Sequence, residues 1–185
     1  GLAGWRWSSI APEFPHEDNP WTFWQVRRST HQAADLCEVS LVEDGGALHA
    51  FFRATGADYN GHLWHALSTD FGTTWSRPEP IDFSDNDAKF QVGRLDAERC
   101  FYCGCPDLNS GKRNPLVFSI AKKDLHFDRH WIIGDTIHRI NWPGKHKSGD
   151  YSYPSVLVHE GRVYVIVARQ KEDIEILSFN ASDLS

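Results

Sequence analysis

The sequence has 185 residues, of which 41% are hydrophobic, 13% aromatic and 24% charged, with a formal net charge of −6. This is the composition of a globular domain, and without clustered Lys and Arg a nucleic-acid partner is not expected. No apolar run is long enough to span a membrane, and no signal-peptide pattern opens the sequence. Because it begins at Gly1 and contains no Met, we expect a trimmed or processed piece of a longer protein. A secreted or periplasmic location stays open.

Three stretches of the sequence repeat one plan, in which two β-rich runs joined by a tight polar turn precede a third β-rich run. The turns are rich in acidic residues and glycine, which is typical of hairpins. The repeats recur at roughly 50 to 60 residues, near the length of a propeller blade, and a sandwich would not explain them. We therefore predict an all-β chain, a single β-propeller domain over residues 1–185. Its repeat units span about 36–83, 88–135 and 151–185.

The predicted propeller is partial. Three repeats and a Trp-rich opening (Trp5, Trp7, Trp21, Trp24) make about half of a common propeller. Half a propeller would leave sheet faces unpaired, so we expect either missing blades or self-association.

The first repeat ends in a recognisable turn motif, Ser68-Thr-Asp-Phe-Gly-Thr-Thr-Trp75. It resembles the Asp box of the sialidase (neuraminidase-like) superfamily, Ser-x-Asp-x-Gly-x-Thr-Trp, also called the BNR repeat. The resemblance implies a sialidase-type β-propeller, six-bladed when complete. It also implies a structural role: Asp70 bonds turn amides, Gly72 supplies a permissive φ, and Trp75 packs between strands, away from the catalytic face.

Two later segments are also similar to sialidase-like proteins. Arg113-Asn-Pro-Leu-Val-Phe-Ser119 resembles their Arg-x-Pro-Leu strand, and Tyr151-Ser-Tyr-Pro-Ser-Val156 resembles the segment with their catalytic tyrosine. The resemblance implies that a tyrosine is the nucleophile. Tyr153 is the match by position, and Tyr151 is its neighbouring rival.

Propeller geometry predicts which positions meet at one face. The starts of first and third strands and the ends of second strands converge there, at Glu38, Arg53, His62, Lys89, Cys105, Arg113, Tyr153, Arg169 and Glu172. Sialidases bind the sugar carboxylate with three arginines, since guanidinium pairs with a carboxylate. By resemblance the candidates are Arg53, Arg113 and Arg169. Aligning the second strands puts Arg53 and Arg169 in register.

The remaining catalytic roles are less marked in the sequence. A phenol is a weak nucleophile near pH 7, so a carboxylate must take its proton. Glu38 is the candidate on geometry. Sialidases also use an acid/base aspartate after an Arg-Ile-Pro-like segment, which this sequence lacks. Asp35 and Asp58 lie within reach of the same face, and nothing selects either.

Three functions follow as hypotheses. The first is a glycoside hydrolase resembling an exo-sialidase, with a carbohydrate substrate, catalytic Tyr153 and Glu38, and Arg53, Arg113, Arg169 and His62 binding the substrate. The second is a uronate-directed polysaccharide lyase, in which arginines neutralise the carboxylate and a tyrosine or a histidine (His31, His62) removes and returns protons. The third is a non-catalytic carbohydrate-binding propeller. No cofactor is expected. No metal is expected either, because Cys100 and Cys103 lack a second ligand pair and point to opposite faces of a strand.

Overall fold

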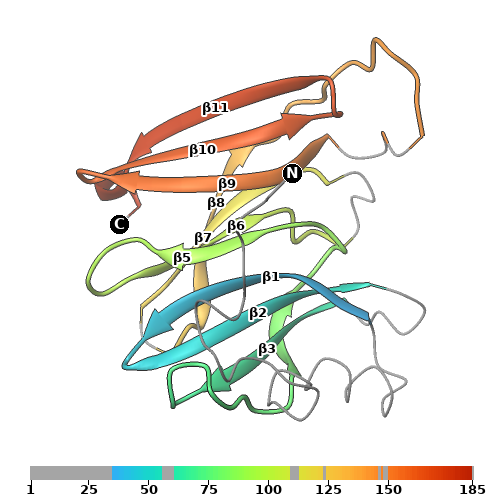
Figure 1. Ribbon diagram of the computed structural model, residues 1–185. Coiled ribbons are helices and arrows are strands. Elements are labelled where there is room, and N and C mark those ends of the chain that lie inside the picture. The colour runs from blue at the N-terminus through green and yellow to red at the C-terminus, as the bar shows by residue number, and fades with distance from the viewer. Residues whose placement is uncertain are drawn as a thin grey trace, which may run out of the picture.

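The computed structural model describes residues 35–55, 61–108, 113–122, 124–145, 147 and 150–184. The four tryptophans of the opening and His31 lie outside this part of the chain. The described residues form three antiparallel sheets arranged side by side as blades (Figure 1). No helix among them is long and apolar enough to cross a membrane. The all-β, propeller-like prediction is confirmed.

The first sheet has the strand order β1-β2-β3-β4. Gly45 and Gly46 have φ of 60° and 82°, which matches the tight turn that joins its first two strands. Its strands are β1 (Asp35–Asp44), β2 (Ala47–Thr55), β3 (His62–Ser68) and β4 (Glu79–Ser84).

The second sheet repeats this order and lies between the other two. Its middle strands are buried along their whole length, because a neighbour covers each face. Cys100 packs toward the first sheet and Cys103 toward the third, as the strand geometry predicts. The strands are β5 (Gln91–Arg94), β6 (Cys100–Gly104), β7 (Leu116–Ala121) and β8 (Phe127–Gly134).

The third sheet has three strands in the order β11-β10-β9. Its centre alternates strictly: Val163, Val165 and Val167 are buried against the second sheet, while the residues between them face outward. The outward face carries exposed Leu157, Tyr164, Ile166, Ile174 and Ile176. The strands are β9 (Tyr151–His159), β10 (Arg162–Arg169) and β11 (Asp173–Asn180).

Side chains join the blades. One core lies between the first and second sheets and includes Phe51, Val92 and Tyr102. A second core lies between the second and third sheets, where the rings of Phe101 and Phe118 stack at 5.2 Å. These two apolar layers fix the relative placement of the inner strands.

Candidate functional site

The inner strands begin at one side of the molecule, which we call the mouth. Asp35 pairs with Thr55 and Tyr151 with Arg169, so the starts of β1 and β9 lie beside the ends of β2 and β10 (Figure 1). Strands β1 and β5 are in contact, as are β5 and β9. Side chains from distant parts of the sequence therefore meet at the mouth.

Two inner strands carry a β-bulge at the same place in the mouth. In β1 the register shifts between Cys37 and Ser40, and Glu38 has a φ of 48°. In β9 the shift falls between Ser152 and Ser155, and Tyr153 has a φ of 55°. A bulge inserts an extra residue and re-aims its side chain. Glu38 and Tyr153 are thus equivalent positions in two blades, a relation that the strand pattern did not reveal.

The bulges correct one expectation. Arg53 pairs with Cys37, immediately before the first bulge, whereas Ala168 pairs with Ser152 before the second. Ala168 is therefore the counterpart of Arg53, and the prediction that Arg169 is in register with it was wrong by one residue. Since strand side chains alternate, the two arginines lie on opposite faces of their blades.

Arg53 is held by two carboxylates. Its Nη1 lies 2.5 Å from Oε2 of Glu38, its Nε lies 2.9 Å from Oδ1 of Asp87, and the side chain is 14% exposed. Burial alone would lower the pKa of Arg53, but the hydrogen bonds to Glu38 and Asp87 outweigh it and raise the pKa. Asp87 was missed in the sequence because it lies in the link between two blades, at a φ of 47°.

A buried carboxyl group lies beneath this cluster. Asp85 is 1% exposed, and its Oδ2 accepts a hydrogen bond from the backbone N–H of Ala54 at 2.8 Å. Its Oδ1 is buried without a hydrogen-bond partner among the described residues. Burial raises the pKa of Asp85 to about 7, against the hydrogen bonds from the backbone of Ala54 and Ala88, which lower it.

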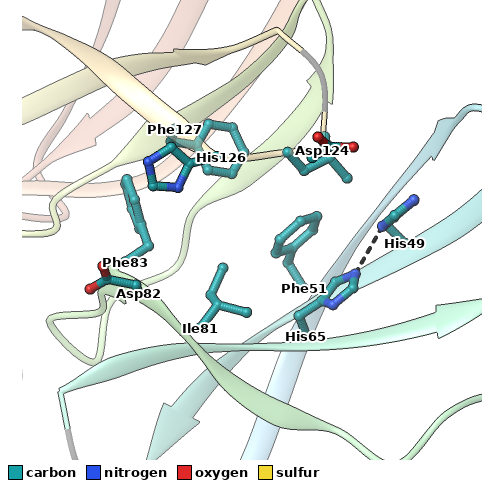
Figure 2. Close-up of a pocket in the computed structure, with 10 residues that line it drawn as sticks. His49, Phe51, His65, Ile81, Asp82, Phe83, Asp124, His126 and Phe127 are labelled. Carbon is teal, nitrogen blue, oxygen red and sulfur yellow. Dashed lines mark hydrogen bonds between the residues drawn. The ribbon is translucent and has the colours of Figure 1, made fainter.

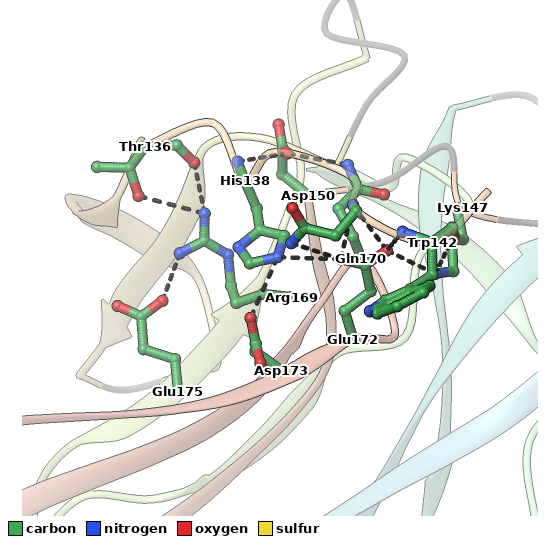
Figure 3. Close-up of polar contacts among 11 residues, drawn as sticks. Thr136, His138, Trp142, Lys147, Asp150, Arg169, Gln170, Glu172, Asp173 and Glu175 are labelled. Atoms are coloured by element: carbon green, nitrogen blue, oxygen red, sulfur yellow. Dashed lines mark hydrogen bonds and ion pairs between the residues drawn. The ribbon is translucent and has the colours of Figure 1, made fainter.

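The guanidinium of Arg169 is also bound by other groups of the protein. It is 5% exposed and forms an ion pair with Glu175, and its Nη2 donates to the carbonyl of Thr136 at 2.7 Å (Figure 3). Its guanidinium lies over the ring of Tyr151, 4.0 Å from the centroid. This arrangement joins the end of β10 to the loop after β8.

Arg113 differs from both. Among the described residues, no carboxylate lies within ion-pair distance of its guanidinium, and Nη1 is 3.4 Å from Oγ of Ser152. Its carbonyl accepts the N–H of Tyr151 at 3.2 Å. Its φ of 54° is uncommon for a residue other than glycine. An arginine that pairs with no carboxylate of the described residues thus lies next to the bulge that carries Tyr153.

The two candidate tyrosines have opposite environments. Tyr151 is 1% exposed, and its Oη lies 3.2 Å from Oγ1 of Thr136. Tyr153 is 50% exposed. Of the pair, Tyr153 is therefore the one that a ligand can reach.

The other expected residues lie farther out or are not described. Nδ1 of His62, in the third strand of its sheet, donates to the carbonyl of Ile81 at 3.1 Å in the fourth strand. Asp58 lies outside the described residues, and so does the side chain of Asp35.

The Asp-box turn lies at the end of β3, opposite the mouth. Oδ1 of Asp70 accepts the N–H of Thr74 and the hydroxyl of Ser68, both at 2.8 Å. Nε1 of Trp75 donates to the carbonyl of Gly72, whose φ is 85°. The side-chain hydrogen bond from Thr74 is the largest cause that lowers the pKa of Asp70, to about 2.

No group of three or more His, Cys, Asp or Glu side chains that could hold a metal ion is present in the described part of the chain. The functional groups described at the mouth are guanidinium, carboxylate and phenol groups.

Comparisons with known proteins agree with this architecture. Residues 9–165 match the model of the BNR repeat-like domain family. A search of curated protein sequences found no match.

Several solved structures share the fold. A sialidase of Streptococcus pneumoniae, NanB, is 18% identical with a TM-score of 0.60, over 82% of this chain and 24% of that one. A Hadza microbial sialidase is 10% identical with a TM-score of 0.62, over 81% and 28%. An α-L-arabinofuranosidase domain of Coprinopsis cinerea is 11% identical with a TM-score of 0.53, over 83% and 48%.

The chain thus spans about a quarter of the length of the two sialidases that it matches. At these identities the likeness shows the fold, which agrees with the three blades described above. The matched family covers most of the sequence, including all of the first two sheets and the bulge of the third. The chain belongs to the BNR repeat-like domain family, with a sialidase-type β-propeller fold.

Proposed function

We propose that the chain is part of a glycoside hydrolase that resembles an exo-sialidase and cleaves a terminal acidic sugar. The observation that carries the proposal is the guanidinium of Arg113, which no carboxylate of the described residues neutralises, beside the bulge that exposes Tyr153. The proposal places the sugar carboxylate on Arg113 through charge-assisted hydrogen bonds. The anomeric carbon then faces the Tyr153 hydroxyl.

In the proposed reaction the Oη of Tyr153 attacks the anomeric carbon and loses its proton to Glu38. The glycosidic C–O bond breaks, its electron pair stays on the leaving oxygen, and that oxygen takes a proton from an acid. Water then attacks the anomeric carbon of the glycosyl–tyrosine intermediate and gives a proton to the deprotonated acid. The bond to Oη breaks, the phenolate takes its proton back from Glu38, and the sugar is released. Asp35 and Asp58 remain the candidates for the acid.

The other two arginines receive different roles in this proposal. Arg53 binds Oε2 of Glu38, so we assign it to orienting the base rather than to gripping substrate. Arg169 fixes the loop after β8 through Thr136. The exposed apolar face of the third sheet supports a complete propeller made with further blades or a second copy.

The test is turnover of fluorogenic glycosides of sialic acid and of neutral sugars by the full-length protein. Arg113→Gln should lower kcat/KM on the sialoside by about 100-fold, because a guanidinium–carboxylate pair is lost. Arg129→Gln, in the outermost strand of the same sheet, is the matched control and should change little. Wild-type rates on the sialoside after Arg113→Gln would refute the assignment.

A carbohydrate-binding propeller without turnover is the second candidate. It is favoured by the two protein carboxylates on Arg53 and the one on Arg169, which leave one of the three expected arginines for an anionic sugar. Sugar binding by the wild-type protein without product, unchanged by Tyr153→Phe, would select this function. Absorbance from a new C=C bond would select the lyase instead.

A further inference from the structure

The loop between β8 and β9 holds an indole ring in solvent at the mouth side. Trp142 is 74% exposed, and the described part of the loop, residues 135–145, projects beyond the end of β10 and the start of β11 (Figure 1). A large aromatic ring gains free energy when a ligand or a neighbouring surface covers it. Because this ring is not packed in a core, only contacts of the backbone can hold Trp142 in place.

Such contacts are present, and they act on the backbone of Trp142. Glu172, in the turn between β10 and β11, has a side chain that is 4% exposed. Its Oε1 accepts the N–H of Trp142 at 2.7 Å and the Nζ of Lys147 at 2.7 Å (Figure 3). Lys147 also donates to the carbonyl of Trp142. Both backbone groups of Trp142 are therefore bound, while its ring is left free.

Glu172 also binds the residue that precedes Trp142. We call its contacts with Asn141, Trp142 and Lys147 the Glu172 clamp. Asn141 donates its backbone N–H to Oε2 of Glu172 at 3.0 Å and its Nδ2 to the same oxygen at 3.2 Å. The pKa of Glu172 is lowered to about 2, chiefly by the hydrogen bond from Lys147 and then by the N–H of Asn141. These hydrogen bonds therefore favour the ionised form of the carboxylate.

Hydrogen bonds of one buried carboxylate connect the base of this loop to the proposed sugar site. Asp150, 2% exposed, accepts the backbone N–H of His138 at 3.1 Å, the Nε2 of Gln170 at 3.0 Å and the Nδ2 of Asn114 at 3.1 Å. Asn114 directly follows Arg113. One buried carboxylate thus links the base of the Trp142 loop to the residue beside the free guanidinium.

We propose that Trp142 is a stacking platform for the apolar face of a pyranose ring that is linked to the acidic sugar. The inference rests on the proposed function, because the mouth supplies the neighbouring sugar. The Glu172 clamp already orders the loop before any ligand binds. The free energy gained by stacking on the ring is therefore not reduced by the loss of conformational entropy that ordering a loop would cause.

The experiment compares two substrates of the full-length protein. 3′-Sialyllactose carries a neighbouring pyranose, and the methyl glycoside of sialic acid does not. Trp142→Ala should lower kcat/KM on sialyllactose by about three- to tenfold and leave the methyl glycoside within twofold. Trp142→Phe should restore most of the difference. Ile137→Ala, at an 82% exposed residue of the same loop, is the control.

An unchanged ratio of the two rates in Trp142→Ala would overturn the platform and leave the hydrolase standing. No turnover of either substrate by the wild-type protein would overturn the hydrolase. In that case, calorimetry of sialyllactose binding to the wild-type protein and to Trp142→Ala decides whether the platform exists. Weaker binding by Trp142→Ala supports the platform. Equal binding by the two proteins, or no binding by either, refutes it. An effect of Trp142→Ala on self-association alone would assign the ring to a protein contact and also refute the platform.

Discussion

The two halves of the mouth are built from similar residues and differ in charge balance. Between the first and second blades, Arg53 is held by Glu38 and Asp87, and Lys89 donates to the carbonyl of Phe90 at 2.6 Å. Between the second and third blades, Arg113 has no carboxylate partner among the described residues. In the first half the arginine is neutralised by carboxylates, whereas in the described part of the second half no carboxylate neutralises Arg113.

The tyrosines and bulges sharpen this difference. Each half has a bulge near the mouth, and the residue in it is a carboxylate paired with arginine in one half and an exposed phenol in the other. The same β-bulge therefore carries a different kind of side chain in each half of the mouth. The ion pairs fix the side chains in the first half, and our proposal assigns the binding of an anionic sugar to the second.

The largest expected effect removes the exposed phenol. Tyr153→Phe should lower kcat on an acidic glycoside by about 1,000-fold, because the nucleophilic oxygen is lost. Tyr164→Phe, on the outward face of the third sheet, should leave kcat unchanged. Steady-state kinetics with both variants measures this. Comparable loss in the two variants would remove the contrast between the halves of the mouth.

The next effect concerns stability. Arg169→Met should lower the free energy of unfolding by about 3 kcal/mol, since it leaves Glu175 and the Thr136 carbonyl without their partner. Arg113→Met should change the free energy of unfolding by less than about 1 kcal/mol, because no carboxylate of the described residues loses a partner. Urea denaturation of both variants tests the difference. An equal cost for the two would contradict the view that one arginine is structural and the other free.

A pH-dependent effect is expected in the first half. Folding raises the pKa of Asp85 to about 7, so the native state holds a proton that the unfolded state has lost above about pH 4. Stability from this group is present at low pH and falls as the pH rises toward 7. The stability of Asp85→Asn relative to wild type should therefore increase by about 2 kcal/mol between pH 5 and pH 8. Denaturation at the two values measures it, and a constant difference would show that the carboxyl is ionised throughout.

The smallest effect lies in a pocket between the first two blades. Nδ1 of His49 and Nε2 of His65 are 2.9 Å apart beside Phe51 (Figure 2). Burial lowers the pKa of His65 to about 4, so the unfolded state takes up a proton between pH 6.5 and 4 that the native state refuses. Stability should fall as the pH drops through this range. His65→Gln should reduce that fall by about 1 kcal/mol between pH 7 and pH 5, and His159→Gln should not.

The blade architecture could be read from the sequence, because it depends on local signals. The glycines at 45 and 46, the Asp-box turn and the alternation of Val163, Val165 and Val167 each predict a strand end or a face. The free guanidinium of Arg113 and the exposure of Tyr153 could not be predicted. Both depend on which carboxylates and rings pack nearby, and those come from other blades.

The bulges explain the error in register. Nothing in the residues around Glu38 or Tyr153 marks an extra residue, since a bulge changes hydrogen bonding without changing the apolar pattern on either side. The alignment of Arg53 with Arg169 assumed regular strands. Asp85 and Asp87 were missed for a related reason: in a link between blades, no periodicity separates a buried carboxyl from a solvated one.

A bulge also has an evolutionary consequence. Glu38 and Tyr153 each occupy a position that a regular ladder would omit, and β1 and β9 resume normal pairing at Ser40 and Ser155. A single inserted codon in an inner strand can therefore place a reactive side chain in the mouth without shifting the buried residues beyond it. Deleting that codon would return a silent blade that still folds. In these two strands, the side chain presented at the mouth can thus change by one residue while the buried residues of the core keep their places.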